Sequence, residues 1–312
     1  MVSNKVQKVL EKQGYRFVGR HSACKICEWT RKSLVDEDVC YKQKFYGVQS
    51  HLCCQMTPSI FCVNRCVFCW RDTSLTTKTS FDKKIDEPKD IVKGCIEAQK
   101  KLLSGFGGNE DTNLKKFKDA QDPKYFAISL TGEPTLYPQL GGLLSELKKQ
   151  KRCSFLVTNG LFPKSLENLE DLPVQLYVSV DAPNKKLYDK VDKPLMKDSW
   201  KRFNQTLELL PNLNTRRVLR LTLVKGLNMT DIEGYAQLIK KADPDFVEVK
   251  AYMWVGHSRL NLSLGNMPLH EDVTSFSRQI SEATGLRIAD EKENSRVVLL
   301  TNKAKRKLSF ED

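Results

Sequence analysis

The 312-residue chain lacks the features that would place it in a membrane or outside the cell. It has no uninterrupted apolar run of about 18 residues, so no transmembrane helix is predicted. Its first residues lead into a charged segment with no apolar stretch, so no signal peptide is predicted. Ten cysteines without a secretory signal indicate reduced thiols used as metal ligands rather than disulfides. We therefore expect a cytoplasmic protein without a membrane partner.

The chain also has fewer acidic than basic residues. The chain has 51 Lys and Arg against 38 Asp and Glu, which gives a formal net charge of +13. Any single basic patch is readily explained as the solvated face of a helix. The excess over the whole chain favours a nucleic-acid partner, held with salt-dependent affinity, but it does not distinguish RNA from DNA.

Three cysteines, Cys62, Cys66 and Cys69, have the spacing C-x3-C-x2-C, and Phe68 precedes the last. A [4Fe–4S] cluster normally takes four thiolates, so three leave one iron open to a ligand. The alternatives are a zinc knuckle or three structural cysteines, but zinc sites usually add a second C-x2-C pair. The motif resembles that of the radical S-adenosylmethionine (SAM) enzymes. This resemblance implies that the open iron binds SAM, that one electron cleaves SAM to a 5′-deoxyadenosyl radical, and that Phe68 lies beside the adenine.

Past Pro58, apolar β-branched runs alternate with amphipathic stretches. The predicted strands are 59–61, 125–130, 154–158, 174–180, 218–224 and 245–251, with a late strand at 297–300. The predicted helices are 87–103, 138–150, 197–210, 230–241 and 270–283. This alternation predicts an α/β fold with βα units and a parallel sheet. Six units fit an incomplete TIM-type (βα)6 barrel, the fold that the resemblance implies, with its chemistry at the carboxyl ends of the strands.

Three regions are expected along the chain. Residues 1–58 form an N-terminal extension that begins with a helix over 3–12, residues 59–301 form the barrel, and residues 302–312 form a basic C-terminal tail. Residues 104–124 are polar and lysine-rich, which predicts a surface loop or insertion, with a disordered connection as the alternative.

A Thr131-Gly132-Glu133 turn, followed by Pro134, ends the second predicted strand. By itself Gly-Glu-Pro indicates only a turn. At this distance after the cysteine motif it resembles the Gly-Gly-Glu turn of radical SAM enzymes, with Thr131 in place of the first glycine. The resemblance implies that the turn binds the SAM ammonium group, for which a carboxylate and a close glycine backbone are suited.

Polar residues also end the next two predicted strands. Asn159 follows the third, and Ser179 and Asp181 end the fourth. They are candidates for the ribose hydroxyls and the carboxylate of SAM. Strand-end capping explains each of them equally well.

A second group of cysteines precedes the barrel, at Cys24, Cys27, Cys40, Cys53 and Cys54. Three further thiols in a cluster protein suggest a second iron–sulfur cluster. Zinc, held by Cys24, Cys27, Cys40 and either Cys53 or Cys54, is the competing interpretation.

A narrower resemblance rests on four segments: C-Y-K-Q-K-F-Y-G at 40–47, S-H-L-C-C-Q-M-T-P at 50–58, F-C-W-R at 68–71 and A-Y-M-W-V-G at 251–256. They are similar to the tRNA 4-demethylwyosine synthases of wyosine and wybutosine synthesis. The similarity extends over nearly the whole chain. It implies that N1-methylguanosine beside the anticodon of phenylalanine tRNA gains two carbons of pyruvate and closes a third ring, while the remaining carbon is lost.

The same resemblance assigns a second [4Fe–4S] cluster to Cys27, Cys40 and Cys53. It matches Lys42 to a lysine proposed to form a Schiff base with pyruvate; contact with a substrate carboxylate or phosphate is the alternative, and Lys44 is the control position. Eukaryotic relatives carry a flavodoxin-like domain that this chain does not show, so an external electron donor such as a ferredoxin or flavodoxin is expected. We also expect a monomer.

Three aromatic residues near strand ends, Trp70, Tyr252 and Trp254, are candidates for stacking on the substrate base, or for packing at the end of the barrel. Two rival functions remain open at this stage. A glycyl-radical activase would leave the basic excess and the 40–53 block unexplained. A non-catalytic metal-containing RNA-binding module would leave the Gly132-Glu133-Pro134 turn unexplained.

Overall fold

The computed structural model describes residues 2–81 and 84–308. Ten strands form one sheet in the order β1-β2-β3-β4-β5-β6-β7-β8-β10-β9. The strands are β1 (Arg16–Val18), β2 (Ser22–Cys24), β3 (Cys53–Thr57), β4 (Tyr125–Ile128), β5 (Cys153–Thr158), β6 (Gln175–Ser179), β7 (Arg216–Leu223), β8 (Phe246–Ala251), β9 (Ile288–Lys292) and β10 (Val297–Leu300). The α-helices are α1 (Asn4–Lys12), α2 (Glu28–Leu34), α3 (Tyr41–Tyr46), α4 (Thr73–Thr76), α5 (Pro88–Leu103), α6 (Leu114–Asp119), α7 (Leu140–Lys149), α8 (Pro163–Glu167), α9 (Lys185–Val191), α10 (Ser199–Leu209), α11 (Ile232–Ala242) and α12 (His270–Thr284).

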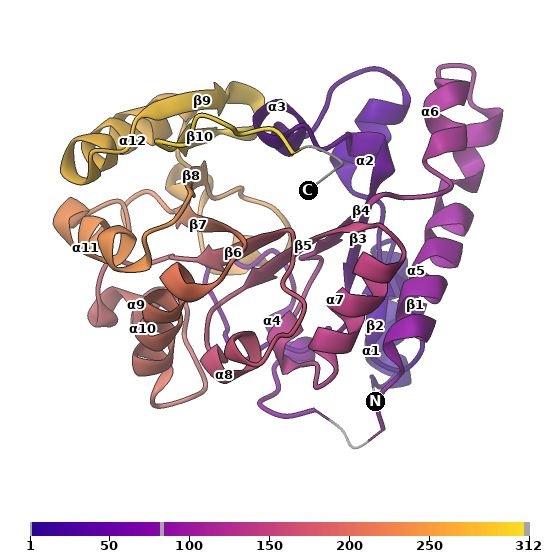
Figure 1. Ribbon diagram of the computed structural model, residues 1–312, viewed down its shortest axis with the longest axis horizontal. Helices are drawn as coiled ribbons and strands as arrows, with labels where there is room; N and C mark the ends of the chain where they lie inside the picture. Colours follow the sequence, from indigo (N-terminus) through magenta and orange to yellow (C-terminus); the bar gives the residue numbers. More distant parts are fainter. Residues whose placement is uncertain (1, 82–83, 309–312) are drawn as a thin grey trace.

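The six strands from β3 to β8 are parallel, each paired with the next in sequence. Helices α5, α7, α10 and α11 lie along the outside of this curved sheet (Figure 1). The antiparallel strands β1 and β2 extend one edge, and β10 and β9 extend the other. The predicted α/β fold, an incomplete (βα)6 barrel, is therefore confirmed.

Alternating side chains of the parallel strands enter two different apolar cores. Phe126 and Val178 belong to the large core beneath the outer helices. Their neighbours Tyr125 and Tyr177 belong to a second core, which also holds Tyr41 of α3. The second core therefore lies on the concave side of the sheet, in the barrel lumen, with α3 packed against it.

The first barrel strand differs from the prediction. It is β3, Cys53–Thr57, whereas the predicted strand 59–61 has no strand conformation. Pro58 ends β3 because it has no N–H to continue the ladder. The next residues pair with the Gly132 turn instead, since the Glu133 N–H donates to the Phe61 carbonyl at 2.6 Å. The strand that opens the barrel thus begins inside the region predicted as an extension.

The segment 104–124 is also more ordered than predicted. It contains α6, whose N-cap Asn113 accepts a hydrogen bond from the Lys116 N–H. Asn113 also donates its N–H to the Leu34 carbonyl at the end of α2. The lysine-rich composition of the segment reflects an exposed helix face rather than a disordered connection.

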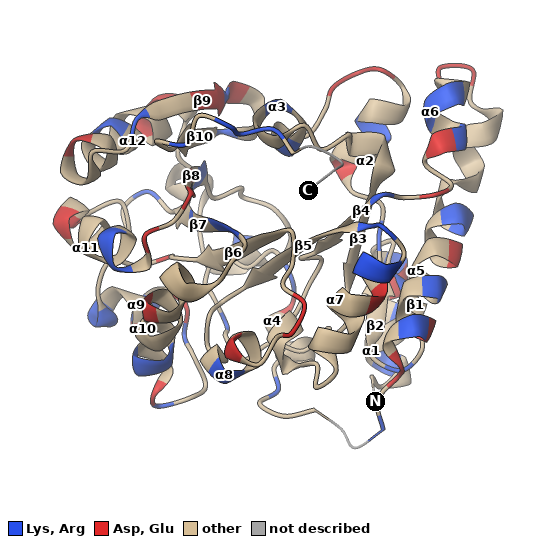
Figure 2. Ribbon diagram, viewed as in Figure 1, with Lys and Arg blue, Asp and Glu red and all other residues tan. Residues whose placement is uncertain are grey.

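The basic tail, as far as residue 308, folds back over α3; residues 309–312 of the predicted tail lie outside the described part of the chain. The Leu308 N–H donates to the Tyr46 carbonyl at 2.9 Å. Lys307 donates to backbone carbonyls of α3. This stretch is the blue segment that runs from β10 toward α3 in Figure 2. Among the described residues no helix is long and apolar enough to cross a membrane.

Leu299 of β10 offers a test of the second core. Its side chain is fully buried there, so Leu299→Ala should lower the free energy of unfolding by about 2–5 kcal/mol. Leu114→Ala is the matched control because the Leu114 side chain is 67% exposed, and it should change stability by about 0.5 kcal/mol or less. Denaturant unfolding of the two variants measures the difference, and equal effects would contradict the assignment of Leu299 to the core.

Candidate active site

One cavity, with a volume of about 150 Å³, lies at the carboxyl ends of the parallel strands. We call it the mouth cavity. Of the residues predicted from sequence, those that line it are Cys62, Cys66, Cys69, Phe68, Thr131, Gly132, Glu133, Asn159, Ser179 and Asp181. They come from the loop after β3 and from the ends of β4, β5 and β6. The fold therefore brings every residue predicted to contact SAM or its cluster to one place, while their individual roles stay predictions.

The three cysteines of the C-x3-C-x2-C motif open onto the mouth cavity from one loop. Burial raises the pKa of the Cys62 thiol to about 12 and also raises that of Cys66. Thiols buried in this way ionise only when a cation compensates their charge, which iron does for its thiolate ligands. The donor set therefore fits a cluster held by three thiolates.

Two further residues of the mouth cavity were not predicted from sequence. Asn64 and Asp192 are each about 2–3% exposed, and three of their side-chain atoms lack a hydrogen-bond partner among the described residues. The Cys66 thiol donates to Asp192 Oδ1 at 3.1 Å. Buried polar atoms without partners in a cavity are the groups that a ligand would satisfy. The position of Asn64 between two motif cysteines is a usable sequence signal, whereas Asp192 belongs to no motif.

The Gly132 turn is held tightly against the segment that precedes the cysteines. Gly132 has φ of +71°, and a Cβ there would overlap the Ser59 carbonyl oxygen. The buried Glu133 carboxylate accepts hydrogen bonds from Thr135, Thr158 and the Asn159 N–H at 2.6–3.0 Å. Burial nevertheless raises the pKa of Glu133. The carboxylate thus fixes the ends of β4 and β5 to each other, and its contact with the SAM ammonium group stays a prediction.

Asp181 lies opposite this turn, after β6. Its Oδ1 accepts a hydrogen bond from the Thr222 N–H at 3.2 Å. Burial raises the pKa of Asp181 to about 6, so its carboxylate is costly to keep charged without a ligand. A hydroxyl pair such as that of a ribose would give it donors.

The second group of cysteines divides between two environments. Cys24 and Cys54 are buried in the large core under α5, where the Cys24 thiol faces the Cys95 carbonyl. Cys53, the neighbour of Cys54 in β3, points to the opposite face of the strand, as alternation requires. The two extra cysteines are therefore separated from Cys27, Cys40 and Cys53.

Cys27, Cys40 and Cys53 meet on the lumen side of the sheet. Burial raises the pKa of Cys40 to about 11 and that of Cys53 to about 12, and repulsion from Cys27 adds to both. Among the described residues no group of three His, Cys, Asp or Glu side chains is placed to hold a single metal ion.

Lys42 points into the lumen, and Lys44 does not. The Lys42 ammonium lies 4.5 Å from the centre of the Tyr177 ring and 5.4 Å from that of Phe155. Burial, followed by repulsion from Arg220, lowers its pKa. The Lys44 side chain is 49% exposed and pairs with Asp290. Of the two lysines, Lys42 has the surroundings of a nucleophilic amine.

A buried network holds α3 in this position. Glu248 of β8 is fully buried and accepts hydrogen bonds from the Tyr41 and Tyr46 hydroxyls at 3.0 and 2.9 Å. Arg220 of β7 donates to the same carboxylate at 3.0 Å and to the Tyr41 hydroxyl at 2.9 Å. Two residues of α3, on either side of Lys42 and Lys44, are thereby anchored to the barrel wall.

The mouth cavity and Lys42 share one lumen. Along β5 and its end, Phe155 contacts Lys42, and Asn159 lines the mouth cavity. Along β6, Tyr177 contacts Lys42, and Ser179 lines the mouth cavity. Residues i and i+2 of a strand point the same way and lie about 7 Å apart. The two sites are therefore separated by one or two rows of side chains.

The three candidate stacking residues have different surroundings. Tyr252 is buried, and its hydroxyl donates to Ser258, so it packs the end of the barrel. Trp254 is half-buried, donates its ring N–H to the Leu262 carbonyl and carries the Arg259 guanidinium on its ring. Trp70 is half-buried beside Arg71. Tyr252 is therefore unsuited to stacking on a base. Of the three candidates, only Trp70 and Trp254 expose part of their side chains to solvent.

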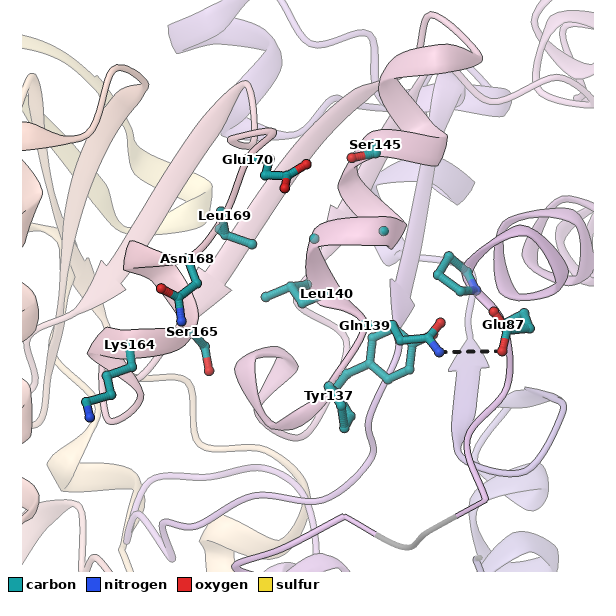
Figure 3. Close-up of a pocket in the computed structure, with 14 residues that line it drawn as sticks. Glu87, Tyr137, Gln139, Leu140, Ser145, Lys164, Ser165, Asn168, Leu169 and Glu170 are labelled. Atoms are coloured by element: carbon teal, nitrogen blue, oxygen red, sulfur yellow. Dashed lines mark hydrogen bonds between the residues drawn. The ribbon is translucent and has the colours of Figure 1, made fainter.

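A larger groove of about 780 Å³ lies on the outside of the barrel, between the starts of α5, α7 and α8 (Figure 3). Gln139 donates to Glu87 across it at 3.4 Å. None of the residues predicted from sequence to form a site lines this groove. Size therefore does not identify the active site in this molecule.

Comparisons with known proteins agree with this arrangement. The profile of the radical SAM superfamily matches residues 56–239, and that for wyosine base formation matches residues 241–302. The S-adenosyl-L-methionine-dependent tRNA 4-demethylwyosine synthase of Pyrococcus abyssi is 48% identical over 300 residues, which are 95% of this chain and 88% of that protein. The human protein of the same name, TYW1, is 40% identical over 305 residues, which are 97% of this chain and 42% of its own length. A solved structure of TYW1 with a lysine–pyruvate adduct bound superposes with a TM-score of 0.88 at 35% identity, covering 99% of each chain.

Gly132→Ala tests the tight turn at the mouth cavity. The added methyl group would overlap the Ser59 carbonyl and a left-handed backbone would be strained, so we expect SAM affinity to fall at least about tenfold. Gly105→Ala is the control, because a Cβ there meets no atom within 4 Å. Equilibrium dialysis with labelled SAM measures the change, and wild-type affinity in Gly132→Ala would contradict the placement of SAM against this turn.

Proposed function

The chain belongs to the tRNA 4-demethylwyosine synthases of the radical SAM superfamily, and from this premise we propose how its residues share the reaction. It is a radical SAM enzyme that forms the tricyclic wyosine base on tRNA. Its cofactors include SAM and one [4Fe–4S] cluster, which together supply the carbon-centred radical that removes a hydrogen atom from the substrate. The substrate we propose is N1-methylguanosine beside the anticodon of phenylalanine tRNA, with pyruvate as the source of two carbons.

The mouth cavity is the proposed site of SAM. Cys62, Cys66 and Cys69 hold the cluster, and the Gly132 turn receives the methionine end of SAM. The Asp181 carboxylate accepts hydrogen bonds from the ribose hydroxyls. Glu133 and Asp181 are buried and the three cysteines are half-buried, which limits the access of water to a site where a radical would otherwise be quenched.

Lys42 is the proposed attachment point of pyruvate. Its lowered pKa increases the fraction of neutral amine, whose nitrogen attacks the ketone carbon; loss of water then leaves a protonated imine. The faces of Tyr177 and Phe155 stabilise the cationic forms of this nitrogen. The lysine–pyruvate adduct in the related TYW1 structure supports this role.

Cys27, Cys40 and Cys53 are the proposed ligands of a second [4Fe–4S] cluster. Burial and mutual repulsion disfavour three free thiolates, and iron would remove that cost. A cluster there would lie beside Lys42, because the positive charge of this lysine partly offsets the rise in the pKa of all three thiols. A cluster held by these three thiolates would leave one iron that could bind the pyruvate carboxylate.

One observation carries the proposal: successive side chains on one face of β5 and β6 contact Lys42 and then line the mouth cavity. A base that has left its stack can therefore meet a SAM-derived radical at one end and pyruvate at the other. Such a lumen is not expected of a non-catalytic RNA-binding module. A glycyl-radical activase would have no use for the lumen lysine.

The two cysteine sets should separate two steps. Cys66→Ala should abolish both 5′-deoxyadenosine and tricyclic nucleoside, because the cluster that reduces SAM is lost. Cys40→Ala should retain 5′-deoxyadenosine and lose the tricyclic nucleoside. Mass spectrometry after anaerobic incubation of reconstituted protein with dithionite, SAM, pyruvate and N1-methylguanosine tRNA measures both products. Wild-type turnover by Cys66→Ala would overturn the radical SAM site, and an unchanged yield of tricycle from Cys40→Ala would overturn the second cluster.

The two lysines of α3 give a matched pair for the pyruvate site. Borohydride should trap pyruvate on the wild-type protein and on Lys44→Arg, but not on Lys42→Arg, since a guanidinium forms no imine under these conditions. Product formation by Lys42→Arg should fall at least about 100-fold. Peptide mass mapping locates the adduct, and its recovery on any lysine other than Lys42 would contradict the assignment.

A further inference from the structure

A cluster of lysines and one arginine lies on the outer surface directly beside the cysteine loop. It is formed by Arg65, Lys186, Lys190, Lys193 and Lys197, and we call it the cluster-loop patch. All five side chains are exposed. In the part of the chain that the structure describes, none of the five has a salt-bridge partner, whereas the nearby Lys185 pairs with Asp189 and Arg202 with Asp198. The patch therefore carries positive charge that is not neutralised by salt bridges among the described residues.

The patch is attached to the cysteine loop by backbone hydrogen bonds. The Arg65 N–H donates to the Asp192 carbonyl at 3.0 Å, and the Val67 N–H donates to the Val191 carbonyl at 2.9 Å. The Leu195 N–H returns a bond to the Val63 carbonyl at 2.9 Å. Arg65 itself directly precedes Cys66. The segment after α9 and the loop that carries the cluster ligands therefore form one unit, and the cluster-loop patch lies on its solvent side.

This placement leaves only a thin layer of protein between the patch and the cluster ligands. Cys66 touches Asp192 through its thiol, and Asp192 directly precedes Lys193 of the patch. A partner bound at Lys193 would therefore lie next to Asp192, the residue whose carboxylate contacts the Cys66 sulfur. Cleavage of SAM consumes one electron each time, and a short path of this kind is where an electron can enter.

We propose that the cluster-loop patch docks an acidic one-electron carrier protein, with a flavin or iron–sulfur centre, that reduces the cluster at Cys62, Cys66 and Cys69. The inference rests on the proposed function. One electron leaves the carrier, which is oxidised by one, and enters the cluster, which is reduced by one. No bond forms between the two proteins. The positive patch selects a negatively charged partner and accelerates its association.

RNA is the other polyanion that such a patch could bind, but the molecule offers RNA a different surface. A groove of about 740 Å³ beside α3 is lined by Lys44, Lys292 and Arg296, by Glu271 and Glu293, and by His270, Asn294 and the exposed Met253 and Leu269. It borders the helix that carries Lys42, toward which the substrate base has to move. Helix α9 lies in the lower part of the view in Figure 1, whereas α3 and β9 lie along its top. We assign the groove beside α3 to the tRNA because it borders the helix that carries Lys42, and the cluster-loop patch is left for the electron carrier.

Charge reversal tests the proposal with a purified acidic flavodoxin as the probe. Lys190→Glu/Lys193→Glu should lower its association rate at least about tenfold at low ionic strength, and the effect should shrink with added salt. The control is Lys100→Glu/Lys101→Glu at the end of α5, which changes the net charge equally on another face. Lys186→Glu/Lys197→Glu is a second patch variant in case the first does not fold. Anaerobic biolayer interferometry measures binding without relying on turnover.

Turnover with two reductants and binding of tRNA complete the test. The patch variants should lose product formation driven by reduced flavodoxin at least about tenfold, while dithionite-driven formation and tRNA affinity remain at the wild-type level. Unchanged flavodoxin binding, or an equal loss in the α5 control, would overturn the proposal. A loss of tRNA affinity alone would reassign the patch to RNA, and a loss of dithionite-driven turnover would make it structural. If wild-type protein with dithionite forms no tricyclic product, the proposed function fails, whatever flavodoxin does.

Discussion

The fully buried carboxylate of Glu248 is the interaction on which the arrangement of this molecule depends. It accepts hydrogen bonds from the hydroxyls of Tyr41 and Tyr46 and from the guanidinium of Arg220, and so holds α3 against β7 and β8. Removing one partner of a buried ion pair typically costs about 3–5 kcal/mol, because the other charge is left uncompensated. Helix α3 has only six residues and could not hold its position through its own stability. Through this tie, Cys40 at its N-cap and Lys42 in its first turn face the lumen.

The lumen then follows from the alternation of side chains along parallel strands. Residues two apart on β5 and β6 point the same way, so the end near α3 meets Lys42 and the carboxyl end meets the mouth cavity. The same alternation sends Cys54 into the large core and leaves Cys53 beside Cys27 and Cys40. A one-residue shift in the register of β3 would exchange the two cysteines.

Much of this could be predicted from the sequence, where the signal was local. The periodicity of 125–130 and 270–283 located β4 and α12 to within two residues. The C-x3-C-x2-C spacing and the Gly132 turn predicted residues that line one cavity. The first strand was misplaced, because the Gly132 turn, far away in sequence, takes up the backbone of residues 59–61. Asp192 and Glu248 belong to no motif, and only the fold brings them beside Cys66 and Tyr41.

The central claim is that one lumen joins the SAM site to the pyruvate site, and isotope transfer tests it most directly. Wild-type protein would be incubated anaerobically with dithionite, SAM, carbon-13 pyruvate and tRNA whose guanosine carries a trideuterated N1-methyl group. If one lumen joins the two sites, deuterium should appear in the 5′-deoxyadenosine and carbon-13 in a tricyclic base, in equal amounts. Unlabelled 5′-deoxyadenosine together with an unmodified base would contradict it.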